Sequence, residues 1–61
     1  MNYLELDEAM LYSMVNMKLR DFYRDLEDFC LSENVDQSDF KERLNELGLN
    51  YNKDTKQLEF K

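Results

Sequence analysis

The chain has 61 residues and a net charge of −6, and it contains one cysteine, Cys30, and no histidine. A disulfide within the chain is therefore excluded, and a zinc site of the usual Cys/His kind lacks its ligands. This length leaves room for one domain, residues 1–61, which needs an efficient core or a second copy of the chain for stability.

The first helix is predicted from about residue 8 to Tyr23. Asp7 can cap its N-terminus, because an aspartate side chain accepts hydrogen bonds from the first free N–H groups. Five apolar residues then recur at helical spacing and form one stripe that we expect to be buried: Leu11, Met14, Val15, Leu19 and Phe22. Ahead of the helix, Leu4 and Leu6 alternate with polar neighbours, which predicts an extended segment lying against the core.

A second, short helix is predicted after a break near residues 24–25. The apolar stripe slips there, which favours two helices over one continuous helix from residue 8 to 32. Asp25 is suited to cap the second helix. Its inner face consists of Leu26, Phe29 and Cys30, so we expect Cys30 to be a core residue rather than a nucleophile or a redox group.

Residues 32–36 are predicted to connect the second helix to a third, which is capped by Asp36 or Ser38. Asn34 tolerates the left-handed conformation of a tight turn, and Val35 can reach toward Phe40 as a hydrophobic staple. The buried edge of the third helix is predicted to consist of Phe40, Leu44 and Leu47. Gly48, the only glycine, suits the left-handed end of a helix.

After Gly48 the apolar period becomes that of a strand. Leu49 and Tyr51, and then Leu58 and Phe60, alternate with polar residues around a polar turn at 53–56, which predicts a hairpin with one dry face. The predicted fold class is therefore α+β and mostly α, with three helices followed by a C-terminal β-hairpin. This is the order of a minimal winged helix-turn-helix domain, and a shared order does not fix a function.

Residues 15–21, Val-Asn-Met-Lys-Leu-Arg-Asp, resemble the marker segment of a small bacterial family catalogued only as a domain of unknown function. The likeness continues through residues 26–30, 40–47 and 48–51, and through a tail from Gln57 to Phe60. This chain departs from the family pattern at Phe29 and Leu49, which replace a leucine and a tyrosine, and at the inserted pair Leu58-Glu59. The resemblance implies the same small fold and supplies no activity.

The residue types argue against an enzyme. Histidine is absent, no serine or threonine has a plausible activating neighbour, and no Gly-rich phosphate loop is present. Acidic pairs such as Asp36/Asp39 and Glu42/Glu46 are better explained as helix-start charges and solvated faces than as a site for a divalent cation. We therefore expect no catalytic, metal-binding or cofactor-binding residue and no cofactor.

Our working hypothesis is a protein–protein interaction module. Met10, Met14 and Met17, with Tyr3 and Tyr12, make the first helix apolar over more than one face, and methionine suits adaptable contacts. We expect Met10 and Met14 to pack beneath the hairpin and the N-terminal strand, whereas Met17 and Tyr12 lie off the main stripe. They can pack beneath the hairpin, or they can meet a second copy of the helix, antiparallel across a two-fold axis, in a homodimer.

The polar residues of the marker segment have two interpretations. In the structural one, Asp21 pairs with Arg24, Arg20 reaches Asp25 or Asp28, and Asn16 bonds a backbone group at the joint between the first two helices. In the functional one, Lys18 and Arg20 hold an acidic partner or a phosphate. These alternatives give five candidate partner-binding residues: Tyr12, Met17, Lys18, Arg20 and Arg24.

A nucleic-acid-binding regulator is the alternative hypothesis, and it would use Arg20, Arg24, Lys53 and Lys56. The third helix would then enter the groove, but its predicted start is acidic and phosphates repel it. A protein partner or a homodimer is therefore preferred. A single free cysteine and a start without a leader pattern predict a cytoplasmic location, and no segment approaches the roughly 18 apolar residues of a membrane span.

Overall fold

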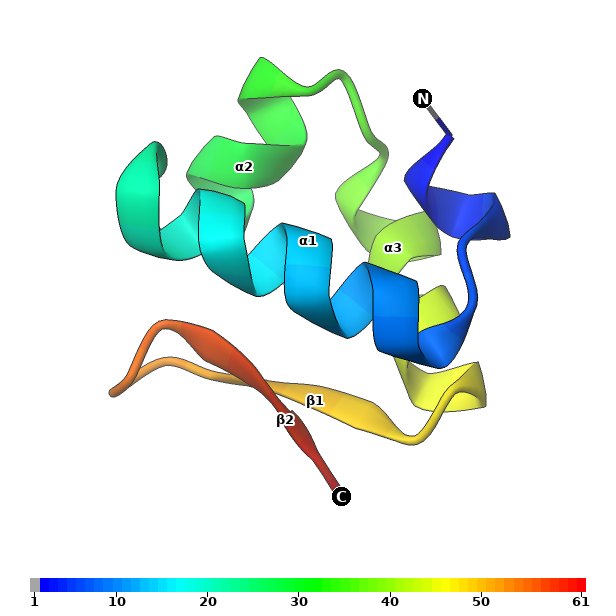
Figure 1. The fold of residues 1–61 in the computed structure, drawn as a ribbon. Coiled ribbons are helices and arrows are strands. Elements are labelled where there is room, and N and C mark those ends of the chain that lie inside the picture. Colours follow the sequence, from blue (N-terminus) through cyan, green and yellow to red (C-terminus); the bar gives the residue numbers. More distant parts are fainter. Residues whose placement is uncertain (1) are drawn as a thin grey trace.

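The computed structural model describes residues 2–61, and its helices and hairpin follow one another as the sequence predicts (Figure 1). A single 3-10 turn, η1, comes first and spans Tyr3–Glu5. The helices are α1 (Glu8–Asp21), α2 (Leu26–Ser32) and α3 (Gln37–Glu46), and the antiparallel strands are β1 (Leu49–Asn52) and β2 (Gln57–Phe60). The predicted fold class, mostly α with a C-terminal hairpin, is confirmed.

Each of the three α-helices begins at an aspartate. Asp7, Asp25 and Asp36 each accept a hydrogen bond from the backbone N–H three residues further on, at 2.8, 2.8 and 3.0 Å. Such a cap contributes about 1 kcal/mol to helix stability. All three predicted starts are confirmed, and Asp36 rather than Ser38 caps α3.

The break between α1 and α2 is also confirmed, although α1 ends two residues earlier than predicted. The backbone N–H groups of Phe22 and Tyr23 both donate to the C=O of Lys18, at 2.8 and 3.0 Å, which closes the helix. Phe22 therefore follows the last helical turn, and its side chain is 69% exposed. Its predicted place in the buried stripe is wrong because the helical spacing stops at Asp21.

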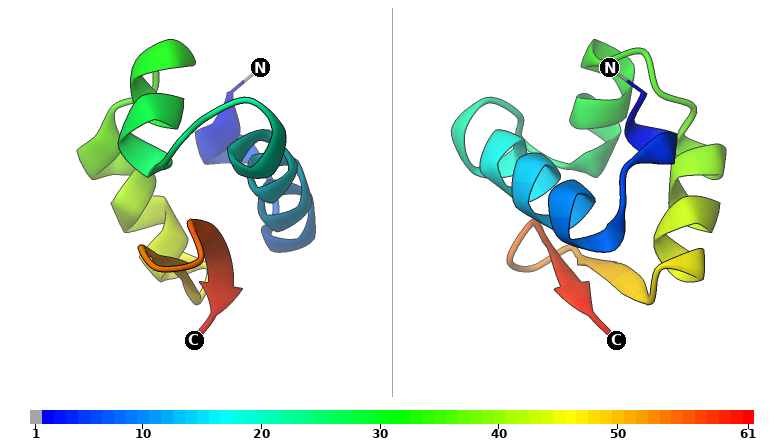
Figure 2. Two further views of the ribbon diagram at one scale, coloured as in Figure 1. Left: turned by 90° about the vertical axis from the view of Figure 1, so that its left-hand side faces the viewer. Right: turned by 45° about the vertical axis from the view of Figure 1, so that its right-hand side comes forward.

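The core lies between α1 on one side and α2 and α3 on the other, and the hairpin closes the open end between them (Figure 2). Phe29 is fully buried in this core. The centroid of its ring lies 5.1 Å from the ring centroid of Tyr3 and 5.5 Å from that of Phe40. The buried residues are Tyr3, Leu11, Val15, Leu19, Leu26, Phe29, Cys30, Phe40, Leu44, Leu49 and Leu58. Among residues predicted to be buried, Met14 and Leu47 are only partly covered.

Residues 3–5 form a 3-10 turn, so the predicted extended segment at the start of the chain is wrong. Asn2 caps this turn by accepting a hydrogen bond from the N–H of Leu4 at 3.0 Å. The turn directs Tyr3 into the core, while Leu4 and Leu6 pack against the core from its edge as expected. Capping of one tight turn thus outweighs the weak alternation of apolar residues.

Two positions adopt the left-handed conformation that the sequence predicts. Asn34 has a φ of 57° in the connection before α3, and Gly48 has a φ of 74° after α3. A Cβ atom on Gly48 would meet nothing within 4 Å. The backbone conformation, rather than lack of space, therefore requires glycine there.

The hairpin register pairs Leu49 with Phe60 and Tyr51 with Leu58, so these four side chains share one face. Leu49 and Leu58 are buried, which confirms the centre of the predicted dry face. Phe60, at its end, is exposed, and its ring stacks on that of Tyr12 with the centroids 4.6 Å apart. The apolar face of the hairpin is therefore buried at Leu49 and Leu58 and exposed to solvent at Phe60, near the C-terminus.

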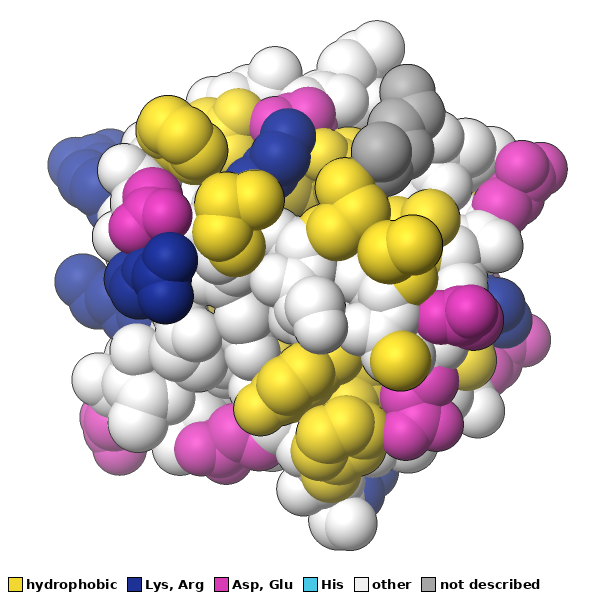
Figure 3. All heavy atoms as spheres, in the orientation of Figure 1, with side chains coloured by type: hydrophobic (Ala, Val, Ile, Leu, Met, Phe, Trp, Pro, Cys, Tyr) yellow, Lys and Arg dark blue, Asp and Glu magenta, His cyan; other side chains and the backbone are white. Residues whose placement is uncertain are grey.

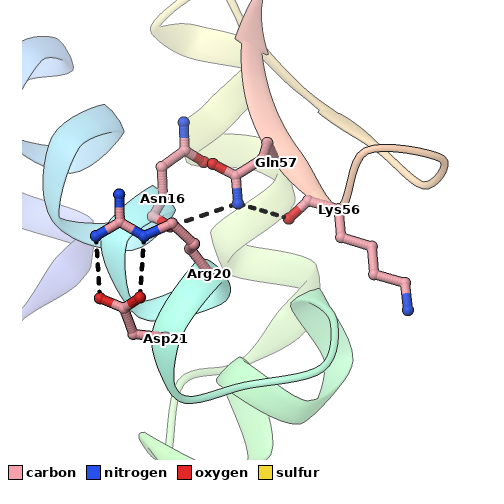
Figure 4. A network of polar contacts seen from close by, with 5 residues as sticks. All are labelled: Asn16, Arg20, Asp21, Lys56 and Gln57. Carbon is pink, nitrogen blue, oxygen red and sulfur yellow. Dashed lines mark hydrogen bonds and ion pairs between the residues drawn. The ribbon is translucent and has the colours of Figure 1, made fainter.

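Asn16 of α1 holds β2 against the helix. Its amide oxygen accepts a hydrogen bond from the N–H of Leu58 at 2.6 Å, and its amide nitrogen donates to the C=O of Leu58 at 3.1 Å. Next to it, the Gln57 side chain donates to the C=O groups of Asn16 and Lys56 (Figure 4). The predicted backbone contact of Asn16 is therefore real, but it lies on β2 rather than at the joint between α1 and α2.

We predict that Asn16→Ala lowers the free energy of unfolding by about 2 kcal/mol, because it leaves the buried N–H and C=O of Leu58 without partners. Urea denaturation followed by circular dichroism measures this loss. Asn50→Ala is the matched control, since Asn50 is exposed on the same hairpin, and it should change stability by less than about 0.5 kcal/mol. Equal losses in both variants would contradict the role given to Asn16.

Candidate functional site

Lys18 lies in a cluster of polar side chains that joins α1, η1 and the end of α2. Its ammonium nitrogen is 3.0 Å from Oε2 of Glu33 and lies 5.6 Å from the centre of the Tyr3 ring. Glu33 also accepts hydrogen bonds from the hydroxyl groups of Tyr3, at 3.3 Å, and Tyr23. We call Tyr3, Lys18, Tyr23 and Glu33 the Glu33 cluster.

The hydrogen bonds of the Glu33 cluster keep its ions charged. The hydrogen bond from the Tyr23 hydroxyl, followed in size by that from the Lys18 ammonium, holds the pKa of Glu33 below its ordinary value. Contacts with Tyr3, and next in size the hydrogen bond to Glu33, raise the pKa of Lys18. Both side chains are largely covered, so the ammonium of Lys18 has its partners inside the molecule.

Arg20 pairs with the neighbouring residue, Asp21, on the exposed side of α1. Nε and Nη2 of Arg20 donate to the two carboxylate oxygens at 2.9 and 3.0 Å (Figure 4). The same hydrogen bond lowers the pKa of Asp21. The predicted partners of Arg20, Asp25 and Asp28, are wrong because both serve the start of α2.

Arg24 lies in the connection after α1, with an exposed side chain. Only its backbone N–H is engaged, donating to Oδ2 of Asp28 at 3.1 Å. The predicted pair of Asp21 with Arg24 does not form, because α1 ends at Asp21 and the two residues no longer share a helix face.

Tyr12 and Met17, both predicted off the main stripe, differ in how far the fold covers them. Tyr12 is partly buried and packs against Phe60 of the hairpin. Met17 is 39% exposed, and Met10, two turns earlier, is 51% exposed, so the predicted packing of Met10 beneath the hairpin is wrong. Packing beneath the hairpin thus accounts for Tyr12 and leaves Met17 open to solvent.

Met10, Met14 and Met17 follow one another at spacings of four and three residues, so they share one side of α1. We call these three residues the methionine face. On the side of the molecule where α1 lies in front, hydrophobic side chains gather in an upper and a lower group (Figure 3). Other large apolar side chains that are exposed among residues 2–61 are Phe22, Leu31 and Phe60.

Comparison with known proteins identifies the family. The model of a family described as a domain of unknown function (DUF4250) matches residues 5–58, from the 3-10 turn into β2. The chain belongs to this family. The match confirms the resemblance found in the sequence to a family of unknown function, and the family description assigns no activity. No curated protein and no solved structure matches the chain.

Within residues 2–61, no three side chains of the metal-binding types converge on one point, and no helix has the length and apolar character that a membrane span needs.

The partners of Glu33 could not be predicted from the sequence, because Tyr3 precedes it by thirty residues and Lys18 by fifteen. Local spacing carries no signal for such contacts.

We predict that Glu33→Gln removes part of the loss of stability at acid pH. Because folding lowers the pKa of Glu33 below its ordinary 4.5, its contribution is complete above that value and is lost as the pH falls through the folded pKa. At pH 7 the variant should be less stable by about 1–2 kcal/mol, since a carboxylate with three donors is replaced by an amide.

Thermal melts between pH 2 and 7 measure this effect. Glu42→Gln is the control, because Glu42 is exposed on α3, and it should keep the acid dependence of the parent protein. A Glu33→Gln variant with unchanged acid dependence would contradict the assignment.

We also predict that Cys30 reacts slowly with a disulfide reagent such as DTNB at pH 8. The side chain is buried, and burial raises the pKa of its thiol to about 11, so little thiolate is present and the reagent cannot reach it. Labelling should become fast and complete in urea. Rapid labelling of the native protein would show instead that Cys30 is an accessible, reactive thiol.

Proposed function

We propose that this protein is a non-catalytic interaction module that forms a homodimer through the methionine face of α1. The observation that supports this proposal is the exposure of Met10 and Met17 on one side of a helix whose opposite side is buried. Methionine side chains are flexible and polarizable, so they suit adaptable protein contacts. A second α1, antiparallel to the first, would cover them.

The small size of the chain supports the same arrangement. A domain of this length buries a smaller share of its surface than a larger one, so an additional apolar contact matters for stability. Covering the exposed part of each methionine contributes roughly 1 kcal/mol. We therefore expect a weak dimer that forms at high protein concentration.

The charges at the ends of α1 are compatible with antiparallel pairing. Glu8 lies in the first turn, and Lys18 and Arg20 lie in the last turn. Lys18 and Arg20 are already paired with Glu33 and Asp21, so the attraction between antiparallel helices comes from their opposed dipoles. Parallel pairing would bring like charges together.

Sedimentation velocity between 10 and 500 µM tests the dimer. We expect the parent protein to be a dimer at the upper concentrations and Met17→Glu to be a monomer with an unchanged circular dichroism spectrum, because a carboxylate at this position opposes burial. Leu31→Glu is the matched control: Leu31 is 75% exposed on α2, and the variant has the same change of charge but should remain dimeric.

Two outcomes would overturn the homodimer. One is a parent protein that stays monomeric at 500 µM. The other is equal dissociation by Leu31→Glu and Met17→Glu, which would attribute the effect to added charge rather than to the methionine face.

The charge distribution gives less support to the alternative, a nucleic-acid-binding regulator. The guanidinium of Arg20 is engaged by Asp21, and the exposed residues of α3 include Asp39, Glu42 and Glu46. A nucleic acid would have to bind against this acidic helix and against the net charge of −6. We therefore expect the protein to pass through a heparin column at low salt, and salt-sensitive retention would favour the alternative.

A further inference from the structure

A groove runs between α3 and β1, on elements that the methionine face does not include. It consists of two shallow hollows of about 240 and 260 Å³, and both are lined by Lys41 and Tyr51. Lys61 lines the first hollow, where its ammonium donates a hydrogen bond to Oδ1 of Asn45, and Lys53 and Lys56 line the second. We call this surface, with its four lysines, the lysine groove.

The lysine groove concentrates positive charge in an acidic protein. The chain has 8 basic and 14 acidic residues, and within residues 2–61 three of the basic ones form ion pairs, namely Lys18, Arg20 and Arg43. Of the remaining five, the four lysines of the groove line one surface and Arg24 lies elsewhere. Cations gathered in a concave site attract anionic ligands more strongly than dispersed ones.

Few carboxylates oppose these lysines. The first hollow has none among its lining residues, and the second has Asp25 and Glu27 at its edge. Asp25 is already engaged in capping α2. A negatively charged ligand would therefore meet the ammonium groups of Lys41, Lys53 and Lys56, whereas that of Lys61 is bonded to Asn45.

The backbone of β1 adds a second feature. The N–H of Lys61 donates to the C=O of Gly48 at 2.9 Å, so these two residues form a hydrogen-bonded pair. Hydrogen-bonded and non-hydrogen-bonded pairs alternate along antiparallel strands. Tyr51 and Leu58 therefore form a non-hydrogen-bonded pair, and the N–H and C=O of Tyr51 point away from β2. Leu58, the partner of Tyr51 in the register, likewise directs its polar groups outward, to Asn16. Within the described chain, the N–H and C=O of Tyr51 have no hydrogen-bond partner.

We propose that the lysine groove binds an acidic segment of a partner protein in an extended conformation. The segment would pair its backbone with the outward N–H and C=O of Tyr51, as an added strand does at the edge of a sheet. Its Asp and Glu side chains, at alternate positions, would contact Lys41, Lys53 and Lys56. This binding is independent of the homodimer, because it uses α3 and β1 rather than α1.

Fluorescence polarisation with a labelled ten-residue peptide of alternating Glu and Val tests the proposal. We expect binding that weakens with salt, and at least a fivefold loss of affinity in Lys41→Glu, which reverses a charge shared by both hollows. Arg24→Glu is the matched control, because it makes the same change of charge outside the two hollows, and it should change the affinity less than twofold.

A second peptide, N-methylated at every other residue, separates backbone pairing from simple attraction of charges. We expect it to bind at least tenfold more weakly, and we expect the unmodified peptide to shift the amide NMR signal of Tyr51. A ten-nucleotide oligo-dT should not bind to the lysine groove.

Any of three results would overturn the proposal. They are equal binding of the methylated peptide, an equal loss of affinity in Arg24→Glu, and oligo-dT binding with the same dependence on Lys41. The last result would identify the groove as a general polyanion site.

Discussion

The amide of Asn16 takes the place of a third strand beside β2, and the rest of the structure depends on it. A two-stranded hairpin is marginally stable in water when it stands alone. Here the outward N–H and C=O of Leu58 are both bonded by one side chain of α1. This bond pair fixes the distance and register of the hairpin relative to α1, and Leu58 and Leu49 then complete the core.

A second polar contact holds the opposite side of α1. Glu33, just after α2, binds Lys18 and the hydroxyl groups of Tyr3 and Tyr23, so it joins the N-terminal turn, α1 and α2 around one carboxylate. Two residues of the segment 15–21, Asn16 and Lys18, therefore connect α1 to the rest of the fold. Asn16 and Lys18 are engaged on two sides of the helix, while Met17 and Arg20 point outward between them.

This division explains why the two proposed surfaces lie where they do. α1 is held from both sides by polar contacts, so its outer side is left for the methionine face. α3 packs beside β1, and the hollows there are lined by Lys41, Lys53 and Lys56, which form no ion pair within residues 2–61, and by Lys61, which is bonded to Asn45.

The sequence alone determined the local features of this protein, because each depends on residues a few positions apart. The aspartate caps, the break between α1 and α2, the left-handed Asn34 and Gly48, and the hairpin were all predictable in this way. Tertiary packing decided the rest: Asn16 bonds Leu58, forty-two residues away, and Glu33 binds Lys18 and Tyr3, fifteen and thirty residues away. Contacts between distant residues depend on how the helices and hairpin pack, and no local pattern of residue types encodes that arrangement.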